Sequence, residues 1–273
     1  MSIKKHIPNT ITCCNLISGC IATSFAFGGS PKLALLWIII GAMFDFFDGM
    51  SARLLHVSSP IGKELDSLAD DVTFGVAPAT IVFSQLFVMN YPSFLEPLRE
   101  YLPYAAFIIA AFSALRLAKF NLDERQTTSF IGVPTPANAL FWGSLIVFDP
   151  FWLSGYTWSI WVVLALILVT SYLLVCEMPL FALKFKQWTY KGNEIKWWFA
   201  AFALAVIVVS IIEDGLMGFL EGWWIVIVAY VLTSVIKYLV ENKKGTSLKR
   251  NEKADTTTWL HIDIKYFKRR INK

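Results

Sequence analysis

DFFDGMSARLLHVSSPIGKELDSLAD, residues 45–70, is the stretch that decides the fold. Four aspartates stand in it at set spacing: Asp45, Asp48, Asp66 and Asp70. Strongly apolar sequence flanks them on both sides, over residues 33–44 and 72–89. Acidic side chains beside apolar segments of this kind are costly to keep in a membrane, and a function is their usual explanation. The stretch therefore predicts a polar site built between membrane helices.

The spacing of the aspartates predicts two acidic helix faces. Asp45 and Asp48 are three residues apart, and Asp66 and Asp70 are four apart. Side chains at either spacing share one face of a helix, with Cβ atoms about 5–6 Å apart. The short connection, residues 54–62, would bring both faces to one pocket. Like charges that close repel one another unless cations neutralise them.

Carboxylate oxygens without nitrogen or sulfur ligands suit hard cations. Oxygen-only sites favour Mg²⁺, Mn²⁺ or Ca²⁺ over zinc, and the cysteines and histidines of the chain show no zinc-ligand spacing. Bridging carboxylates can hold two metals about 3.5–4 Å apart, an arrangement that commonly serves phosphoryl transfer. We therefore expect these four aspartates to bind two divalent cations, Mg²⁺ or Mn²⁺.

Small residues and one arginine accompany the acids. Gly41 and Ala52 fall on the same helical stripe as the first two aspartates, and Gly49 lies beside it. Small side chains let a bulky ligand or a neighbouring helix approach the backbone closely. Arg53 adds a fixed cation suited to a phosphate oxygen. The alternative is that the acids are membrane-edge charges that merely flank two helices.

Residues 45–70 also carry a family pattern. They read D-x-x-D-G-x-x-A-R, then eight residues, then G-x-x-x-D-x-x-x-D. This pattern resembles the signature of the CDP-alcohol phosphotransferases at every fixed position. The resemblance implies an all-helical integral membrane enzyme that displaces CMP from a CDP-linked donor with an alcohol acceptor.

The overall composition of the chain indicates a membrane protein. Hydrophobic residues make up 56% and charged residues 16% of the 273 residues, and both values depart from those of soluble proteins. Apolar runs mark about eight transmembrane helices, several of them shorter than the ideal of about 20 residues. The runs cover residues 11–27, 33–55, 65–89, 104–117, 137–148, 158–175, 197–212 and 223–238. We expect a polytopic catalytic domain over residues 1–240.

Positive charge predicts the orientation of these helices. With eight crossings, nearly all lysines and arginines fall in one set of alternating loops, which includes both termini and residues 45–70. Lys32 and Arg99 are the two exceptions. Cytoplasmic loops carry the excess of positive charge. We therefore expect an inner-membrane protein with both termini and the acidic site at the cytoplasmic face, where a lipid donor and a soluble acceptor can meet.

The opening segment contains polar residues at helical spacing. Asn9, Thr12 and Asn15 stand three residues apart in PNTITCCN. This segment resembles a recurrent opening in the phosphatidylserine synthase branch of the family, and the resemblance implies that these side chains line the nucleotide pocket. Capping of the first helix by Asn9 is the equally weighted alternative.

Two later segments bear on the acceptor. Arg116, Lys119 and Asn121 cluster in ALRLAKFN, which is followed by FIGVPTPA at residues 130–137. Both segments, and TFGVAPA at residues 73–79, resemble the same branch, so we prefer L-serine as acceptor. The cluster would bind an acceptor's carboxylate. The alternative for Arg116 is snorkelling to the membrane interface.

The resemblance and the physical reasoning together assign a role to each residue. The donor would be CDP-diacylglycerol, and Asp70 would be the general base as well as a metal ligand. Gly49, Ala52, Arg53 and Gly62 would bind the donor. Glu64 and Asp71 are further acids that the signature leaves without a role.

Three alternatives to this assignment differ in what they change. Glycerol 3-phosphate or an inositol-type acceptor would keep the chemistry. A cation or proton transporter would spread its acids through the membrane depth.

The family resemblance also suggests a homodimer.

The C-terminal segment, residues 241–273, is a polar and basic tail. Its apolar residues share one helical face at Leu260, Ile264, Phe267 and Ile271. We expect either a short amphipathic helix on anionic lipid or a disordered tail.

Overall fold

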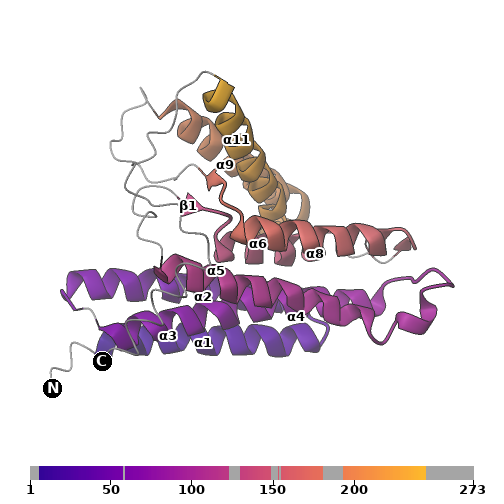
Figure 1. The fold of residues 1–273 in the computed structure, drawn as a ribbon, viewed down its shortest axis with the longest axis horizontal. Helices are drawn as coiled ribbons and strands as arrows, with labels where there is room; N and C mark the ends of the chain where they lie inside the picture. Colours follow the sequence, from indigo (N-terminus) through magenta and orange to yellow (C-terminus); the bar gives the residue numbers. More distant parts are fainter. Residues whose placement is uncertain are drawn as a thin grey trace, which may run out of the picture. The chain divides into compact units, whose positions relative to one another are not determined.

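The computed structural model describes residues 6–57, 59–122, 130–148, 153, 155–180 and 193–243, and these residues are almost entirely helical (Figure 1). Contacts divide the chain into residues 1–235 and 236–273. The tail hypothesis, which concerns residues beyond 243, lies outside the described residues. The helices are α1 (His6–Phe27), α2 (Pro31–Leu54), α3 (Pro60–Asp71), the π-helix η2 (Val72–Val76), α4 (Ala77–Val88), the 3₁₀-helices η3 (Glu96–Leu98) and η4 (Leu102–Phe107), α5 (Ile108–Leu122), α6 (Thr135–Phe148), α8 (Ser159–Val175), α9 (Glu194–Asp214), the 3₁₀-helix η6 (Gly215–Met217), α10 (Gly218–Glu221) and α11 (Trp223–Lys243). Strands β1 (Phe130–Ile131) and β2 (Pro179–Leu180) pair antiparallel.

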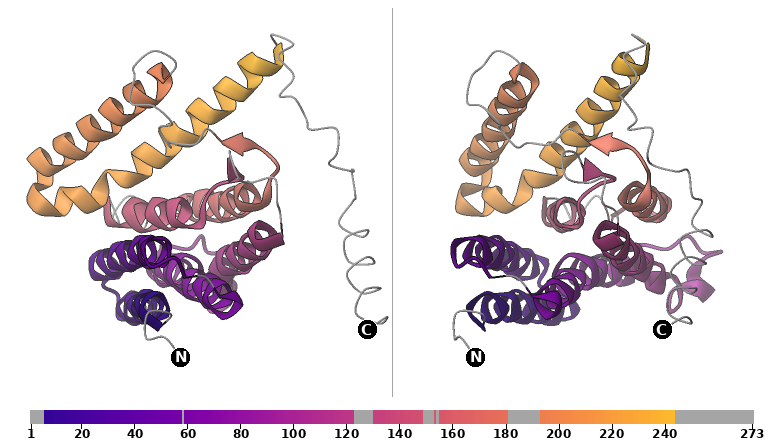
Figure 2. Two further views of the ribbon diagram at one scale, coloured as in Figure 1. Left: turned by 90° about the vertical axis from the view of Figure 1, so that its left-hand side faces the viewer. Right: turned by 60° about the vertical axis from the view of Figure 1, so that its left-hand side comes forward.

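The first five α-helices form one layer, in which α1 and α2 pack along much of their length. Helix α6 packs on α2 and α4, and α8 packs on α5, so these two helices cover one side of the layer (Figures 1 and 2). The core between them contains large side chains that are fully buried, such as Phe74, Ile38 and Trp142. The Trp142 indole donates to Thr170 Oγ1 at 3.1 Å. This packing fixes α2, α3 and η2, the elements that carry the acidic stretch.

Within the described residues, six helical segments are long and apolar enough to cross a membrane by length and composition: His6–Phe27, Pro31–Leu54, Pro60–Val88, Leu102–Leu122, Glu194–Asp214 and Gly218–Tyr238. The fifth and sixth apolar runs of the sequence form shorter helices, α6 and α8. The all-helical membrane architecture is therefore confirmed. The number of eight crossings stays a prediction, and so does the orientation that depends on it.

Helix boundaries differ from the apolar runs where polar residues continue a helix. The first helix begins at His6, five residues before the run that predicted it, so Asn9 lies inside α1 and does not cap it. Capping by Asn9 is therefore wrong. Helix α5 extends to Leu122, well beyond the apolar run that ends at residue 117. In both places the polar residues face the acidic site or a neighbouring helix, so apolar periodicity could not reveal them.

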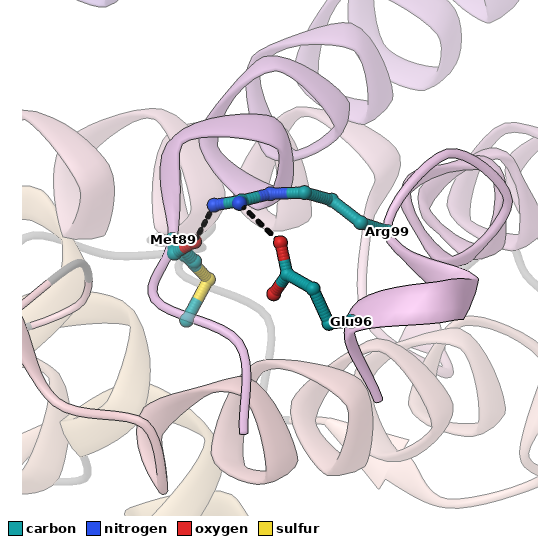
Figure 3. Close-up of polar contacts among 3 residues, drawn as sticks. All are labelled: Met89, Glu96 and Arg99. Carbon is teal, nitrogen blue, oxygen red and sulfur yellow. Dashed lines mark hydrogen bonds and ion pairs between the residues drawn. The ribbon is translucent and has the colours of Figure 1, made fainter. Parts of the chain in front are cut away.

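The segment between α4 and α5 contains two short 3₁₀-helices and is held by Arg99. Its guanidinium donates to Glu96 Oε1 at 2.7 Å and to the Met89 carbonyl at 2.9 Å (Figure 3). It also lies 5.1 Å from the centre of the Tyr91 ring. Burial raises the pKa of the Tyr91 hydroxyl, and the neighbouring Arg99 acts in the opposite direction. One arginine thus closes the end of α4 against η3.

Candidate active site and metal centre

Three of the four aspartates converge. Helix α2 carries Asp45 and Asp48, and α3 carries Asp66. One carboxylate oxygen from each of them lies within 4.8 Å of the others. Asp48 is buried, and the other two are half-buried. The Oδ1 atom of Asp66 is buried without a hydrogen-bond partner among the described residues. Such a group of oxygen ligands fits a hard divalent cation.

The turn before α3 places Asp66 opposite α2. Helix α3 begins with Pro60 in its first turn, where a missing N–H costs nothing. Ser59 precedes it and accepts a hydrogen bond from the Gly62 amide at 3.0 Å, as an N-cap does. Because the cap starts the helix directly after a short turn, α2 and α3 present their acids to each other.

Asp70, the fourth acid, lies one turn further along α3 and outside this group of three. It accepts a hydrogen bond from Asn15 Nδ2 at 3.1 Å. The charges of Asp45 and Asp66 act on its carboxylate. Asp70 is therefore close enough to the group to interact with it electrostatically, and it has a separate contact with α1.

The polar stripe on α1 positions two of the aspartates. Thr12 is buried, and its hydroxyl donates to Asp48 Oδ2 at 2.6 Å. Asn15 is also buried and holds Asp70. Both side chains were expected to line the nucleotide pocket; Thr12 lines the cavity described below, and Asn15 does not. The signal for this positioning role was the three-residue spacing, which sets both side chains on the face of α1 that meets α2 and α3.

Close backbone packing brings α1, α2 and η2 together. A Cβ on Gly19 would lie 2.5 Å from Thr73 Oγ1 and 2.8 Å from the Thr73 Cα. A Cβ on Gly41 would lie 2.6 Å from Thr73 Cγ2. Thr73 in turn donates to the Asn15 carbonyl at 3.0 Å. Gly19 and Gly41 therefore serve helix packing. Gly49 differs from them, because a Cβ built on it would meet nothing within 4 Å.

A cavity of about 260 Å³ opens beside the acids. Five of the residues predicted to bind the donor line it: Asn9, Thr12, Gly49, Ala52 and Gly62. Arg53 does not line it. Residues that the sequence analysis missed also contribute: Pro8, Val57, Ser59 and Lys63. Asp48 and Asp66 form the wall of the cavity on the side of the acidic group.

The residues predicted to bind the acceptor do not act as one cluster. The Lys119 ammonium donates to the Val175 carbonyl at 3.2 Å. The Asn121 amide donates to Ser67 Oγ at 2.7 Å. These two side chains therefore tie α5 to its neighbours. Arg116 is 8% exposed and lies away from the solvent-facing surface, so snorkelling does not describe it.

Comparison with known proteins defines the class. A family model for CDP-alcohol phosphatidyltransferase matches residues 5–173, and the chain belongs to this family. It is accordingly a multi-pass helical membrane protein of an enzyme family.

Several relatives carry one and the same name, CDP-diacylglycerol–serine O-phosphatidyltransferase. The Bacillus subtilis protein is 39% identical over 133 residues, which is 48% of this chain and 70% of the relative. The Mycobacterium tuberculosis protein is 31% identical over 237 residues, or 82% and 75% of the two chains. The Helicobacter pylori protein is 28% identical over 238 residues, or 85% and 90%.

Proposed function

We propose that this protein transfers the phosphatidyl group of CDP-diacylglycerol to L-serine, giving phosphatidylserine and CMP. The observation that carries the proposal is the convergence of three aspartates beside a cavity lined by small residues. The relatives that share the sequence bear the name of this activity. A transporter would need acids spread through the membrane depth, and the gathering of the acids at one place counts against it.

The proposed cofactors are two divalent cations, Mg²⁺ or Mn²⁺. Asp45, Asp48 and Asp66 would hold them, with Asp70 partly shared. The donor set fits, because it consists of carboxylate oxygens and includes a buried Asp66 oxygen that has no partner among the described residues. When bound, such cations neutralise a diphosphate and stabilise the departing CMP.

The remaining chemistry falls to the side chains. Asp70 accepts the proton of the serine hydroxyl, and the serine oxygen forms a bond to the phosphorus that carries diacylglycerol. The bond from that phosphorus to the bridging oxygen breaks, and CMP departs with the electron pair. A carboxylate is a weak base, so close positioning has to compensate. Asn15, which donates to Asp70, orients that carboxylate.

The donor fits the cavity beside α1 and α2. Gly49, Ala52 and Gly62 leave room there for the nucleotide, and the polar side chains of Asn9 and Thr12 also line the cavity. Lys63 adds a positive charge to the lining, which suits a phosphate oxygen. The Lys63 ammonium donates to the Asn121 carbonyl at 3.0 Å, and the proposed contact of Arg53 with a phosphate oxygen stays a prediction.

We further propose an inner-membrane protein with its termini and site at the cytoplasmic face, a catalytic domain over residues 1–240, and a homodimeric state. The charge distribution along the sequence supports the orientation. Protease protection of tagged termini in sealed vesicles tests the orientation, and cross-linking in detergent tests the dimer.

The activity is tested by following CMP release from purified protein in detergent with CDP-diacylglycerol and Mn²⁺. Serine, glycerol 3-phosphate and inositol are supplied in parallel, and we expect turnover with serine only. EDTA should stop it and added Mg²⁺ or Mn²⁺ restore it. Asp70→Asn should abolish turnover while donor binding persists. Turnover with glycerol 3-phosphate in place of serine would refute the proposed acceptor.

A further inference from the structure

A second group of buried polar atoms lies between η2 and α5. The Oδ1 atom of Asp71 is buried and has no hydrogen-bond partner among the described residues. Ser113, on α5, is fully buried, and its Oγ atom also lacks a partner there. Buried polar atoms in native proteins are nearly always paired, so two orphans together call for a ligand or a water.

Gly75 shows that these two orphans face the same space. A Cβ built on Gly75 would lie 2.7 Å from Asp71 Oδ1 and 3.5 Å from Ser113 Oγ. The two oxygens are therefore no farther apart than the sum of these distances. Gly75 belongs to the π-helix η2, and π-helical turns within α-helices occur frequently at functional sites. The candidate metal site does not account for either oxygen, because it consists of Asp45, Asp48 and Asp66.

A buried cation lies one turn further along α5. Arg116 follows Ser113 by three residues, so both side chains share a face of the helix. Among the described residues the guanidinium makes a single hydrogen bond, to Thr135 Oγ1 at 3.4 Å, although it has five N–H donors. Its charge interacts with that of Asp70, the proposed base. A buried guanidinium with free donors is suited to a carboxylate.

The buried side-chain amide of Asn138 is a further hydrogen-bond donor without a partner among the described residues. Asn138 lies one turn after Thr135 on α6 and is 2% exposed. Its Nδ2 atom has no partner in the part of the chain that the structure describes. Hydrogen-bond acceptors thus stand at Asp71 and Ser113, and free donors stand at Arg116 and Asn138.

Resting on the proposed function, we infer that these residues form the acceptor subsite and that it is built for a zwitterion. Asp71 and Ser113 bind the ammonium group of the amino acid, and Arg116 with Asn138 binds its carboxylate. The hydroxyl is then offered to Asp70, whose charge interacts with that of Arg116. An acceptor with a phosphate and no amine would meet the negative charge of Asp71 without a partner for it. The subsite therefore selects a hydroxy amino acid over an anionic alcohol.

The test combines Asp71→Asn with acceptors that lack one charged group. The KM for serine, the KM for CDP-diacylglycerol and the Mn²⁺ activation curve are measured separately. We expect the KM for serine to rise about 10- to 100-fold, because a partner of a charged group is lost, with the other two quantities unchanged. Discrimination between serine and 3-hydroxypropanoate, which lacks the ammonium group, should largely disappear. Arg116→Gln should instead remove discrimination against serine methyl ester.

The control variant is Glu64→Gln, which removes an exposed acid from the same helix and should leave all these quantities unchanged. If Asp71→Asn fails to fold, Ser113→Ala replaces it, because it removes one of the two unpaired oxygens without adding an atom. An unchanged KM for serine with unchanged discrimination in Asp71→Asn, or in Ser113→Ala in its place, overturns this inference and leaves the proposed function standing. Failure of the wild-type protein to use serine at all would instead overturn the proposed function.

Discussion

The hydroxyl of Thr12 offers the sharpest test of how the site is held. Thr12→Val keeps the shape of the side chain and removes its 2.6 Å hydrogen bond to Asp48. A hydrogen bond to a charged group contributes about 1.5–3 kcal/mol, and about 1.4 kcal/mol corresponds to a factor of ten. We therefore expect the Mn²⁺ concentration for half-maximal activity to rise about 10- to 100-fold, in line with the usual effect of losing a residue that orients a metal ligand.

The assay follows CMP release at saturating donor and acceptor while Mn²⁺ is varied. Thr12→Ser retains the hydroxyl and should restore most of the Mn²⁺ affinity. Thr10→Val is the matched control, because Thr10 is exposed on the same helix and its hydroxyl donates to the His6 carbonyl at 2.9 Å. A Thr12→Val protein that folds and shows the same Mn²⁺ dependence as Thr10→Val would refute the positioning role of α1.

Three further predictions concern helix packing, the charge of the acidic group and the segment between α4 and α5. Gly19→Ala should lower the unfolding temperature in detergent by several degrees, because overpacking costs about 1–3 kcal/mol. Gly28→Ala is its control and should leave the unfolding temperature unchanged, because its Cβ would make ordinary contacts of 3.5 Å. Asp66→Asn should raise the unfolding temperature in EDTA, since it removes repulsion within the acidic group, and should lose the stabilisation by Mn²⁺ seen in the wild type; the same shift in both proteins would contradict this. Arg99→Ala should reduce stability by about 1 kcal/mol, the scale of one hydrogen bond and an exposed ion pair, with turnover unchanged, as thermal unfolding and CMP release will show.

The fold could be predicted largely because a membrane demands long apolar helices. Every apolar run of the sequence corresponds to a helix of the structure. The boundaries failed where a helix carries polar residues for the site, as at the start of α1 and the end of α5. The π-helix η2 could not be foreseen, because its apolar residues continue directly into the apolar helix α4. A π-helical turn changes which side chains before and after it share a helix face, and hydropathy does not report such a change.

The site divided in the same way. The spacing of the aspartates was enough to place Asp45, Asp48 and Asp66 together, since helical geometry alone sets which side chains share a face. Adjacency in the sequence grouped Lys119 with Arg116, whereas its ammonium bonds to the Val175 carbonyl, because the direction of a long side chain depends on its neighbours in space. Ser113 and Asn138 gave no signal at all. Only the packing of α5 and α6 shows that their polar atoms are buried without partners.

The acidic group also explains why α1 supplies single hydrogen bonds and no positive charge. Two full charges 4.8 Å apart, the largest separation within the group, repel by at least about 3 kcal/mol at an effective dielectric constant near 20. Three ionised carboxylates therefore oppose one another by more than the about 1.5–3 kcal/mol that a hydrogen bond such as that of Thr12 returns. A lysine in place of Thr12 would neutralise part of this charge permanently and compete with cations for the same oxygens. Hydroxyl and amide donors instead fix the direction of each carboxylate and leave its charge unneutralised. The helices thus hold the acids in place and leave their negative charge for the proposed divalent cations to neutralise.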